Sequence, residues 1–72
     1  MLNNFIMERS QEIKQLREML CLSQTEFAHL LGVSFVSVNR WENGHFEPTI
    51  KIKRKLLLLK KKVINGEYYD CL

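Results

Sequence analysis

Apolar residues recur at helical spacing in separate stretches of the chain. In the first stretch, residues 11–20, the apolar positions Ile13, Leu16 and Leu20 are three or four residues apart, which places them on one face of a helix. Ser10 directly precedes this stretch, and its hydroxyl is a candidate N-cap. The pattern predicts a first helix that buries one face in a core.

A second, shorter helix is predicted directly afterwards. Residues 23–26, Ser-Gln-Thr-Glu, have the spacing of a capping box, in which the serine oxygen accepts from the glutamate backbone N–H and the glutamate side chain reaches back to the serine. Phe27, Leu30 and Leu31 are predicted to face inward. Gly32 is expected to end the helix, because glycine adopts the left-handed conformation at little steric cost.

A third helix is predicted after this glycine. Ser34 is its candidate N-cap, and Val38 and Trp41 lie three residues apart on its inner face. The dipeptide Asn43-Gly44 is a typical helix stop. The helix is therefore expected over about 34–43.

Pro48 and Thr49 introduce a fourth helix, which is predicted to run to about Ile64 and to end at Asn65-Gly66. Its apolar residues form two stripes on the helical wheel. The first stripe consists of Ile52, Leu56, Leu59 and Val63, and the second of Ile50, Leu57 and Ile64. Because one stripe suffices for the core, the second is expected to be covered by the N-terminal segment, by the Tyr68-Tyr69 tail or by a second copy of the chain.

Length and composition are consistent with one helix-rich domain. The chain has 72 residues, of which 46% are hydrophobic, with few glycines and one proline. We expect an N-terminal extension over 1–9, a domain over 10–66 and a C-terminal tail over 67–72. No signal peptide or membrane-spanning stretch is evident, so a cytoplasmic protein is expected.

The net charge of +3 is unevenly distributed, because the C-terminal third holds most of the lysines. Such a basic segment attracts polyanions such as nucleic acid, or forms a solvated helix face. The two cysteines lie far apart, without a CxxC pair, and neither histidine has metal-ligand spacing. Reduced thiols, no metal and no cofactor are therefore expected.

The spacing of small and apolar residues within 23–43 is typical of two helices that cross steeply through a short turn. Counting Gln24 as the first position, Ala28 is the fifth, Gly32 the ninth and Val38 the fifteenth. Such a pair needs a small side chain where the backbones approach, a glycine where the chain reverses and an apolar plug beneath the second helix.

These residues, in the segments LSQTEFAHLLGVS and SVNRWENG with a following proline, resemble the Cro/repressor type of helix-turn-helix, also called XRE. The resemblance covers roughly 10–64. It implies an all-α fold, a compact four- to five-helix bundle of the lambda-repressor-like helix-turn-helix type with the helix-turn-helix unit at 23–43. It also implies that the third helix lies in the DNA major groove.

The same resemblance implies which side chains meet base edges. These are Phe35, Val36, Ser37 and Arg40, with Asn39 as a secondary candidate. Arg40 can donate two parallel hydrogen bonds to guanine O6 and N7, and Phe35 or Val36 can pack on a thymine methyl. The alternative for Phe35 and Val36 is a place in the core, but Val38 and Trp41 already occupy the inner face.

Phosphate contacts are implied for residues around the helix ends and at the start of the fourth helix. The predicted set is Gln24, Ser34, Asn43, Lys51 and Lys53. Asn43 is alternatively a simple helix cap, and the lysines alternatively face only water. Arg17 and Glu42 match family positions that form a partly buried ion pair. Cys21 stands where glycine is usual in the family, which predicts a strained turn there.

Two other classes of function have weaker support in the sequence. An enzyme lacks support, because the chain has no nucleophile-base pair and no glycine-rich phosphate loop, and the His45-Phe46-Glu47 match to zinc deaminases lacks the PCxxC partner. A partner-binding or membrane-surface role would use the leucines and lysines of 51–64.

The sequence thus predicts a non-enzymatic, sequence-specific DNA-binding regulator, most simply a repressor that binds double-stranded DNA. A homodimer formed through 49–64 or the tail is a further expectation, and no membrane or small-molecule ligand is expected. The alternative is an antitoxin-like or partner-binding module on the same scaffold. In the cell, the protein would associate with the nucleoid when it is bound to DNA.

Overall fold

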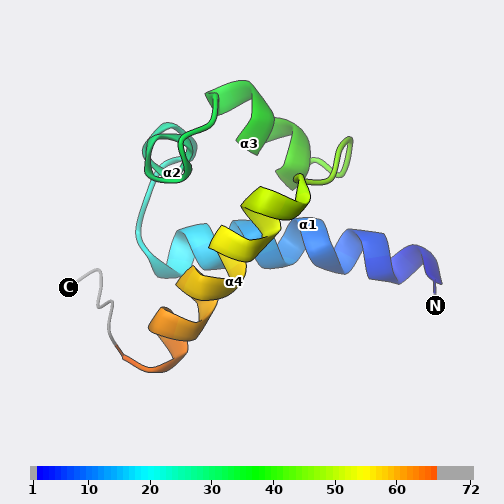
Figure 1. The fold of residues 1–72 in the computed structure, drawn as a ribbon. Coiled ribbons are helices and arrows are strands. Elements are labelled where there is room, and N and C mark those ends of the chain that lie inside the picture. Colours follow the sequence, from blue (N-terminus) through cyan, green and yellow to red (C-terminus); the bar gives the residue numbers. More distant parts are fainter. Residues whose placement is uncertain (1, 67–72) are drawn as a thin grey trace.

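The computed structural model describes residues 2–66, with side chains from Ser10 onward. It contains four helices, α1 (Leu2–Met19), α2 (Gln24–Leu31), α3 (Phe35–Glu42) and α4 (Ile50–Ile64). Figure 1 shows α2 and α3 stacked on one side of α1, with α4 crossing in front of it. No strand occurs within residues 2–66, so the predicted all-α fold class is confirmed.

The first helix begins earlier than predicted. It starts at Leu2 rather than at residue 11, so Ser10 lies inside α1 and the prediction of Ser10 as an N-cap is wrong. Periodicity marks only the part of a helix that packs on a core, and the first turns of α1 extend past the other helices (Figure 1). Because residues 2–10 contain neither glycine nor proline, nothing in the sequence interrupts the helix there.

The turn after α1 has the strain expected from its sequence. Cys21 has a φ of 59°, the left-handed region that glycine adopts without cost. The prediction of a reduced thiol is wrong for this cysteine, because Cys21 is disulfide-bonded in the structure. The two cysteines lie far apart in the sequence, which gave no basis for predicting this bond.

The start and stop signals of α2 are confirmed in atomic detail. The Glu26 N–H donates to Ser23 Oγ over 3.0 Å, and the Ser23 N–H donates to the Glu26 carboxylate over 2.9 Å, which completes the capping box. Gly32 has a φ of 73° and ends the helix. The Lys55 ammonium, on α4, donates to the carbonyl oxygen of Leu31 over 3.2 Å and so satisfies an acceptor at the last turn.

The core forms where the inner faces of all four helices meet. It consists of Ile13, Leu16, Phe27, Ala28, Leu31, Val38, Trp41, Ile52 and Leu59. Leu30 was predicted to face inward and does not, since 47% of it is exposed. In a helix of eight residues the buried face is centred on Phe27, Ala28 and Leu31, and Leu30 lies well around the helix from that centre.

The fourth helix confirms the prediction of two apolar stripes. Thr49 caps α4 through a 3.4 Å hydrogen bond from the Ile52 N–H, and the first stripe packs on the core. The second stripe is exposed: Ile50 by 68%, Leu57 by 53% and Ile64 by 69%. Among the described residues nothing covers it fully. The predicted covering by the tail concerns residues outside those described.

A groove of about 440 Å³ separates the outer parts of α1 and α4. Its apolar lining includes Met19 from α1 and Leu57 and Ile64 from α4, all exposed. Within the described residues, no helix is both long enough and apolar enough to cross a bilayer.

Candidate nucleic-acid interface

The two sides of α3 differ sharply in burial. Val38 is completely buried and Trp41 is 6% exposed, so the inner side is sealed against the core. On the outer side, Phe35 is 47% exposed, Val36 is 51% exposed and Arg40 is exposed as well. The structure therefore places these three predicted base-reading residues on an accessible surface rather than in the core.

The first turn of α3 is fixed by its cap. Ser34 Oγ accepts from the Ser37 N–H over 3.1 Å and lies 3.1 Å from the Ser37 hydroxyl oxygen. Both serines remain at least partly accessible. Because the cap satisfies a backbone donor at the helix N-terminus, it fixes the direction in which Phe35 and Val36 leave the backbone.

Side-chain hydrogen bonds join Gln24, Asn39 and Asn43, three of the residues predicted to contact DNA, in one row. The Gln24 amide nitrogen donates to Glu42 over 2.9 Å, while its oxygen accepts from the Asn39 amide over 3.1 Å. Asn39 in turn accepts from the Asn43 amide over 3.1 Å. This row links the start of α2 to the middle and end of α3. Sequence spacing did not indicate these pairings.

At the buried end of this row lies the predicted Arg17–Glu42 ion pair, which is confirmed. Arg17 Nε and Nη2 donate to the two Glu42 carboxylate oxygens over 2.7 and 3.0 Å. The third donor, Nη1, reaches the carbonyl oxygen of Leu22 over 2.9 Å. The side chains are only 14% and 4% exposed. The pair therefore joins α1 to the last residue of α3.

The hydrogen bond from Arg17 to the Glu42 carboxylate raises the pKa of the Arg17 guanidinium above its ordinary value, although burial acts in the opposite direction. A raised pKa of a cationic group contributes stability at every pH below its unfolded-state value. Arg17 therefore stays charged at neutral pH, and this contribution is lost only when the pH rises through the raised pKa of the folded state.

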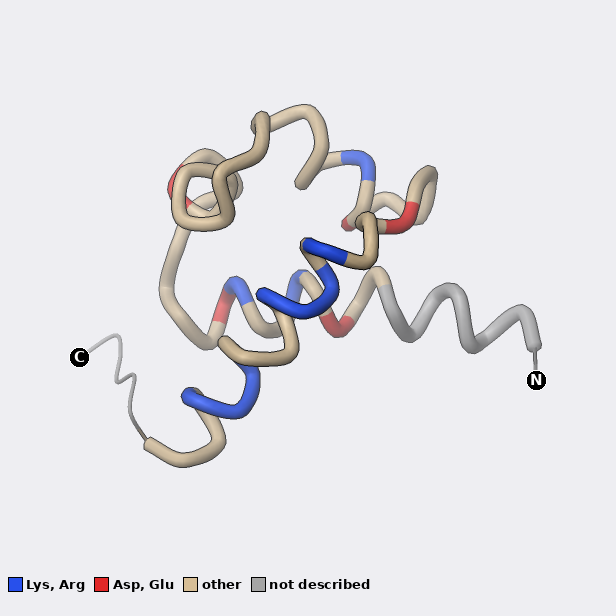
Figure 2. Tube along the Cα trace, viewed as in Figure 1, with Lys and Arg blue, Asp and Glu red and all other residues tan. Residues whose placement is uncertain are grey.

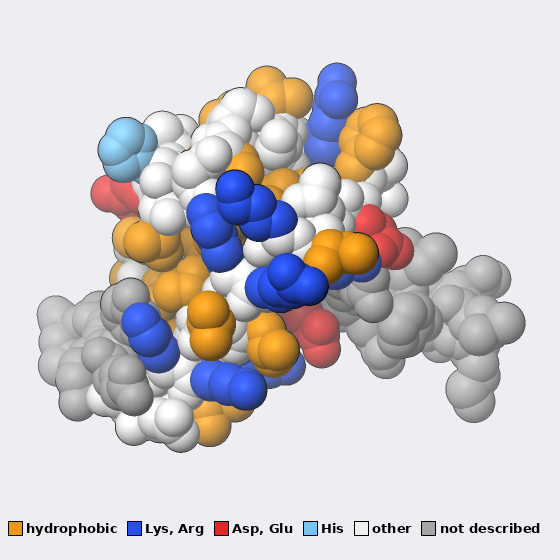
Figure 3. Space-filling view, in the orientation of Figure 1, with side chains coloured by type: hydrophobic (Ala, Val, Ile, Leu, Met, Phe, Trp, Pro, Cys, Tyr) orange, Lys and Arg blue, Asp and Glu red, His pale blue; other side chains and the backbone are white. Residues whose placement is uncertain are grey.

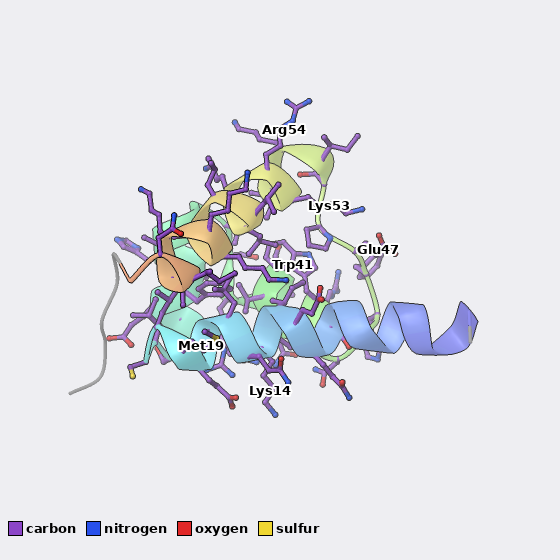
Figure 4. All side chains as sticks on the ribbon, turned by 90° about the horizontal axis from the view of Figure 1, so that it is seen from below. Lys14, Met19, Trp41, Glu47, Lys53 and Arg54 are labelled. Atoms are coloured by element: carbon purple, nitrogen blue, oxygen red, sulfur yellow. The ribbon has the colours of Figure 1, made fainter. Side chains whose placement is uncertain are left out.

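Basic residues lie near the start and near the end of α4 (Figure 2). Lys53 forms a 3.0 Å ion pair with Glu47 and lines the groove beside α1, whereas Lys55 serves the end of α2. In Figure 4, Arg54 points outward from the start of α4 while Lys53 extends on the side of Glu47. Lys51 is exposed. Sequence reasoning predicted a phosphate contact for Lys53, but neither its ion pair with Glu47 nor the hydrogen bond of Lys55 to the end of α2 was predicted.

The space-filling view shows basic and hydrophobic side chains interleaved on the face that α4 presents (Figure 3). One aromatic residue next to α3 was also missed by the predicted site: Phe46, in the connector to α4, lies under the Arg40 guanidinium. Its only sequence signal was an aromatic residue in an otherwise polar loop.

Comparison with known families agrees with this arrangement. Residues 13–59, well over half of the chain, match a family model described as helix-turn-helix. The match runs from the middle of α1 through most of α4 and includes the whole of α2 and α3. No curated protein and no solved structure matches the chain.

Proposed function

Because the chain belongs to the helix-turn-helix family of the Cro/repressor (XRE) type, a family of sequence-specific DNA-binding domains, we propose that it is a transcriptional repressor that reads the major groove with residues 34–43. The observation that supports this most strongly is the accessible outer side of α3, where Phe35, Val36 and Arg40 are exposed although the inner side is sealed. The protein would act in the cytoplasm, on the nucleoid.

In this proposal Arg40 donates to guanine O6 and N7, and Phe35 and Val36 pack against thymine methyl groups. Ser37 contributes a hydroxyl at the start of the helix. Asn39 is less available for base readout than a free asparagine, because its side-chain amide already forms hydrogen bonds with Gln24 and Asn43. It binds a base only through the amide N–H and the oxygen lone pair that its bonds with Gln24 and Asn43 do not use.

Phosphate contacts come from groups around α3 and α4. Gln24 and Ser34 lie at the N-termini of α2 and α3, where backbone N–H groups favour an anion. Asn43 follows α3, and Lys51 is exposed at the start of α4. Lys53 would have to exchange its ion pair with Glu47 for a phosphate. Each phosphate neutralised steepens the log-log salt dependence of binding by about 0.9.

Selection of bound duplexes from random DNA tests the proposal. We expect a short enriched motif whose binding weakens with salt, because base readout and phosphate neutralisation act together. Recovery of no motif, with only weak salt-sensitive binding, would contradict a sequence-specific function and favour a module that binds a protein partner through the same scaffold.

We also propose that α4 is the surface through which two copies pair. Among the described residues, Ile50, Leu57 and Ile64 are exposed, and Leu57 and Ile64 line the groove together with Met19, which leaves an apolar surface that a partner could cover. A twofold pair would bury the same surface on both copies. The antitoxin-like alternative uses this surface for a different protein.

Leu57→Glu is expected to abolish pairing, because it places a charge in the apolar groove. Analytical ultracentrifugation of the wild-type chain should show a dimer, and the variant a monomer. Leu58→Glu is the matched control, since Leu58 is 59% exposed but does not line the groove. A wild-type chain that is monomeric at every concentration, or equal effects of the two variants, would count against pairing at this surface.

A further inference from the structure

The connector between α3 and α4 places the ring of Phe46 next to Arg40 of α3. The Arg40 guanidinium carbon lies over the ring of Phe46, 5.1 Å from the ring centroid. This distance is within the range of about 6 Å over which a cation is attracted to the negative face of an aromatic ring. The two residues are therefore in a cation–π contact.

The ring is held in place by its loop. The His45 N–H donates to the Arg40 carbonyl oxygen over 2.9 Å, which folds the connector back onto the last turn of α3. Phe46 also lines a small crevice together with Trp41 and the buried Pro48, which places it beside the body of the domain. Even so, 58% of Phe46 is exposed, more than a residue needed only for the core.

This contact leaves the hydrogen-bonding groups of Arg40 available. A cation–π contact does not require the N–H donors of the guanidinium, and the Arg40 side chain donates no hydrogen bond to any of the residues 10–66. No carboxylate among residues 10–66 forms an ion pair with Arg40. A salt bridge would have occupied the donors that guanine O6 and N7 require, but an aromatic platform does not.

We propose that Phe46 is a positioning residue for base readout: its ring holds the Arg40 guanidinium in an orientation from which both donors reach one base pair. The inference rests on the function proposed above. An arginine side chain loses considerable rotamer freedom when it binds, and a side chain that is ordered beforehand loses less. Phe46 thus increases specificity at the Arg40 position without touching the base.

The test measures discrimination rather than affinity alone. The probes are the duplex recovered by selection and the same duplex with the Arg40-dependent base pair changed. The ratio of their dissociation constants is compared for wild type, Phe46→Leu and Phe46→Tyr. Leucine keeps an apolar side chain without the aromatic face, and tyrosine keeps both. Thermal unfolding checks that each variant is folded.

We expect Phe46→Leu to lower the ratio about two- to fivefold, the size of an exposed cation–π contact, and Phe46→Tyr to retain it. In an Arg40→Ala background, Phe46→Leu should have no further effect on the ratio. The role of Phe46 would be overturned by an unchanged ratio for Phe46→Leu or by equal weakening on both duplexes. It would also be overturned if Phe46→Leu lowered the ratio by the same factor in the Arg40→Ala background. If Arg40→Ala itself leaves discrimination intact, the assignment of Arg40 in the proposed function fails instead.

Discussion

Glu42→Ala is expected to lower the free energy of unfolding by about 3 kcal/mol or more, because it leaves the Arg17 guanidinium buried without its carboxylate partner. Arg17 is only 14% exposed and forms two hydrogen bonds to Glu42. The variant also removes the acceptor of the Gln24 amide. A domain of this size rarely has more than about 5 kcal/mol of stability, so most of it would be lost. Urea-induced unfolding measures the change.

Two further variants separate the effect of the unpaired Arg17 charge from other effects of the Glu42→Ala substitution. Glu12→Ala removes the carboxylate of a 3.9 Å ion pair to Lys60 whose side chains are both more than half exposed, and it should cost less than about 1 kcal/mol. Adding Arg17→Met to Glu42→Ala removes the unpaired charge and should restore part of the loss. Equal stability of the Glu42→Ala and Glu12→Ala variants would show that the pair is not structurally important.

Arg40→Ala is expected to remove the preference for one base pair and to weaken binding of the selected duplex by about 5- to 150-fold, which corresponds to about 1–3 kcal/mol for a bidentate arginine contact. Affinity for unrelated DNA should fall far less. Arg40 is exposed and is not part of the core, so the fold should be retained. Competition binding with paired duplexes, selected and base-changed, measures the preference.

Lys14→Ala is the control for loss of one positive charge. Lys14 is exposed on α1 and lies on the side of that helix away from α4 (Figure 4). It should reduce affinity for all sequences slightly and equally, through the electrostatic contribution alone. A folded Arg40→Ala protein that keeps its base preference would refute the assignment of Arg40.

Much of the fold could be predicted from local signals. The capping box at Ser23 and Glu26, the left-handed Gly32 and the Ser34 cap each depend on residues within one turn of a helix end, and each is present in the structure. What failed depended on information outside the local pattern. The start of α1 was misplaced because its first turns lack core contacts, and Leu30 was misassigned because spacing alone did not give the centre of the buried face.

The candidate site could be predicted in part. Exposure of Phe35, Val36 and Arg40 follows from the burial of Val38 and Trp41 on the opposite side of one helix. The contact of Arg40 with Phe46 could not be predicted, because it depends on how the connector folds back. The bonds among Gln24, Asn39 and Asn43 likewise depend on the angle between α2 and α3, which spacing does not specify.

The most direct test of major-groove readout by α3 is methylation interference on the selected duplex. Dimethyl sulfate methylates guanine N7, which lies in the major groove and is one of the two acceptors proposed for Arg40. We predict at least one guanine whose methylation prevents binding of the wild-type protein but has no effect on the residual binding of Arg40→Ala. Wild-type binding that tolerates N7 methylation at every guanine would contradict the proposed reading of guanine by Arg40.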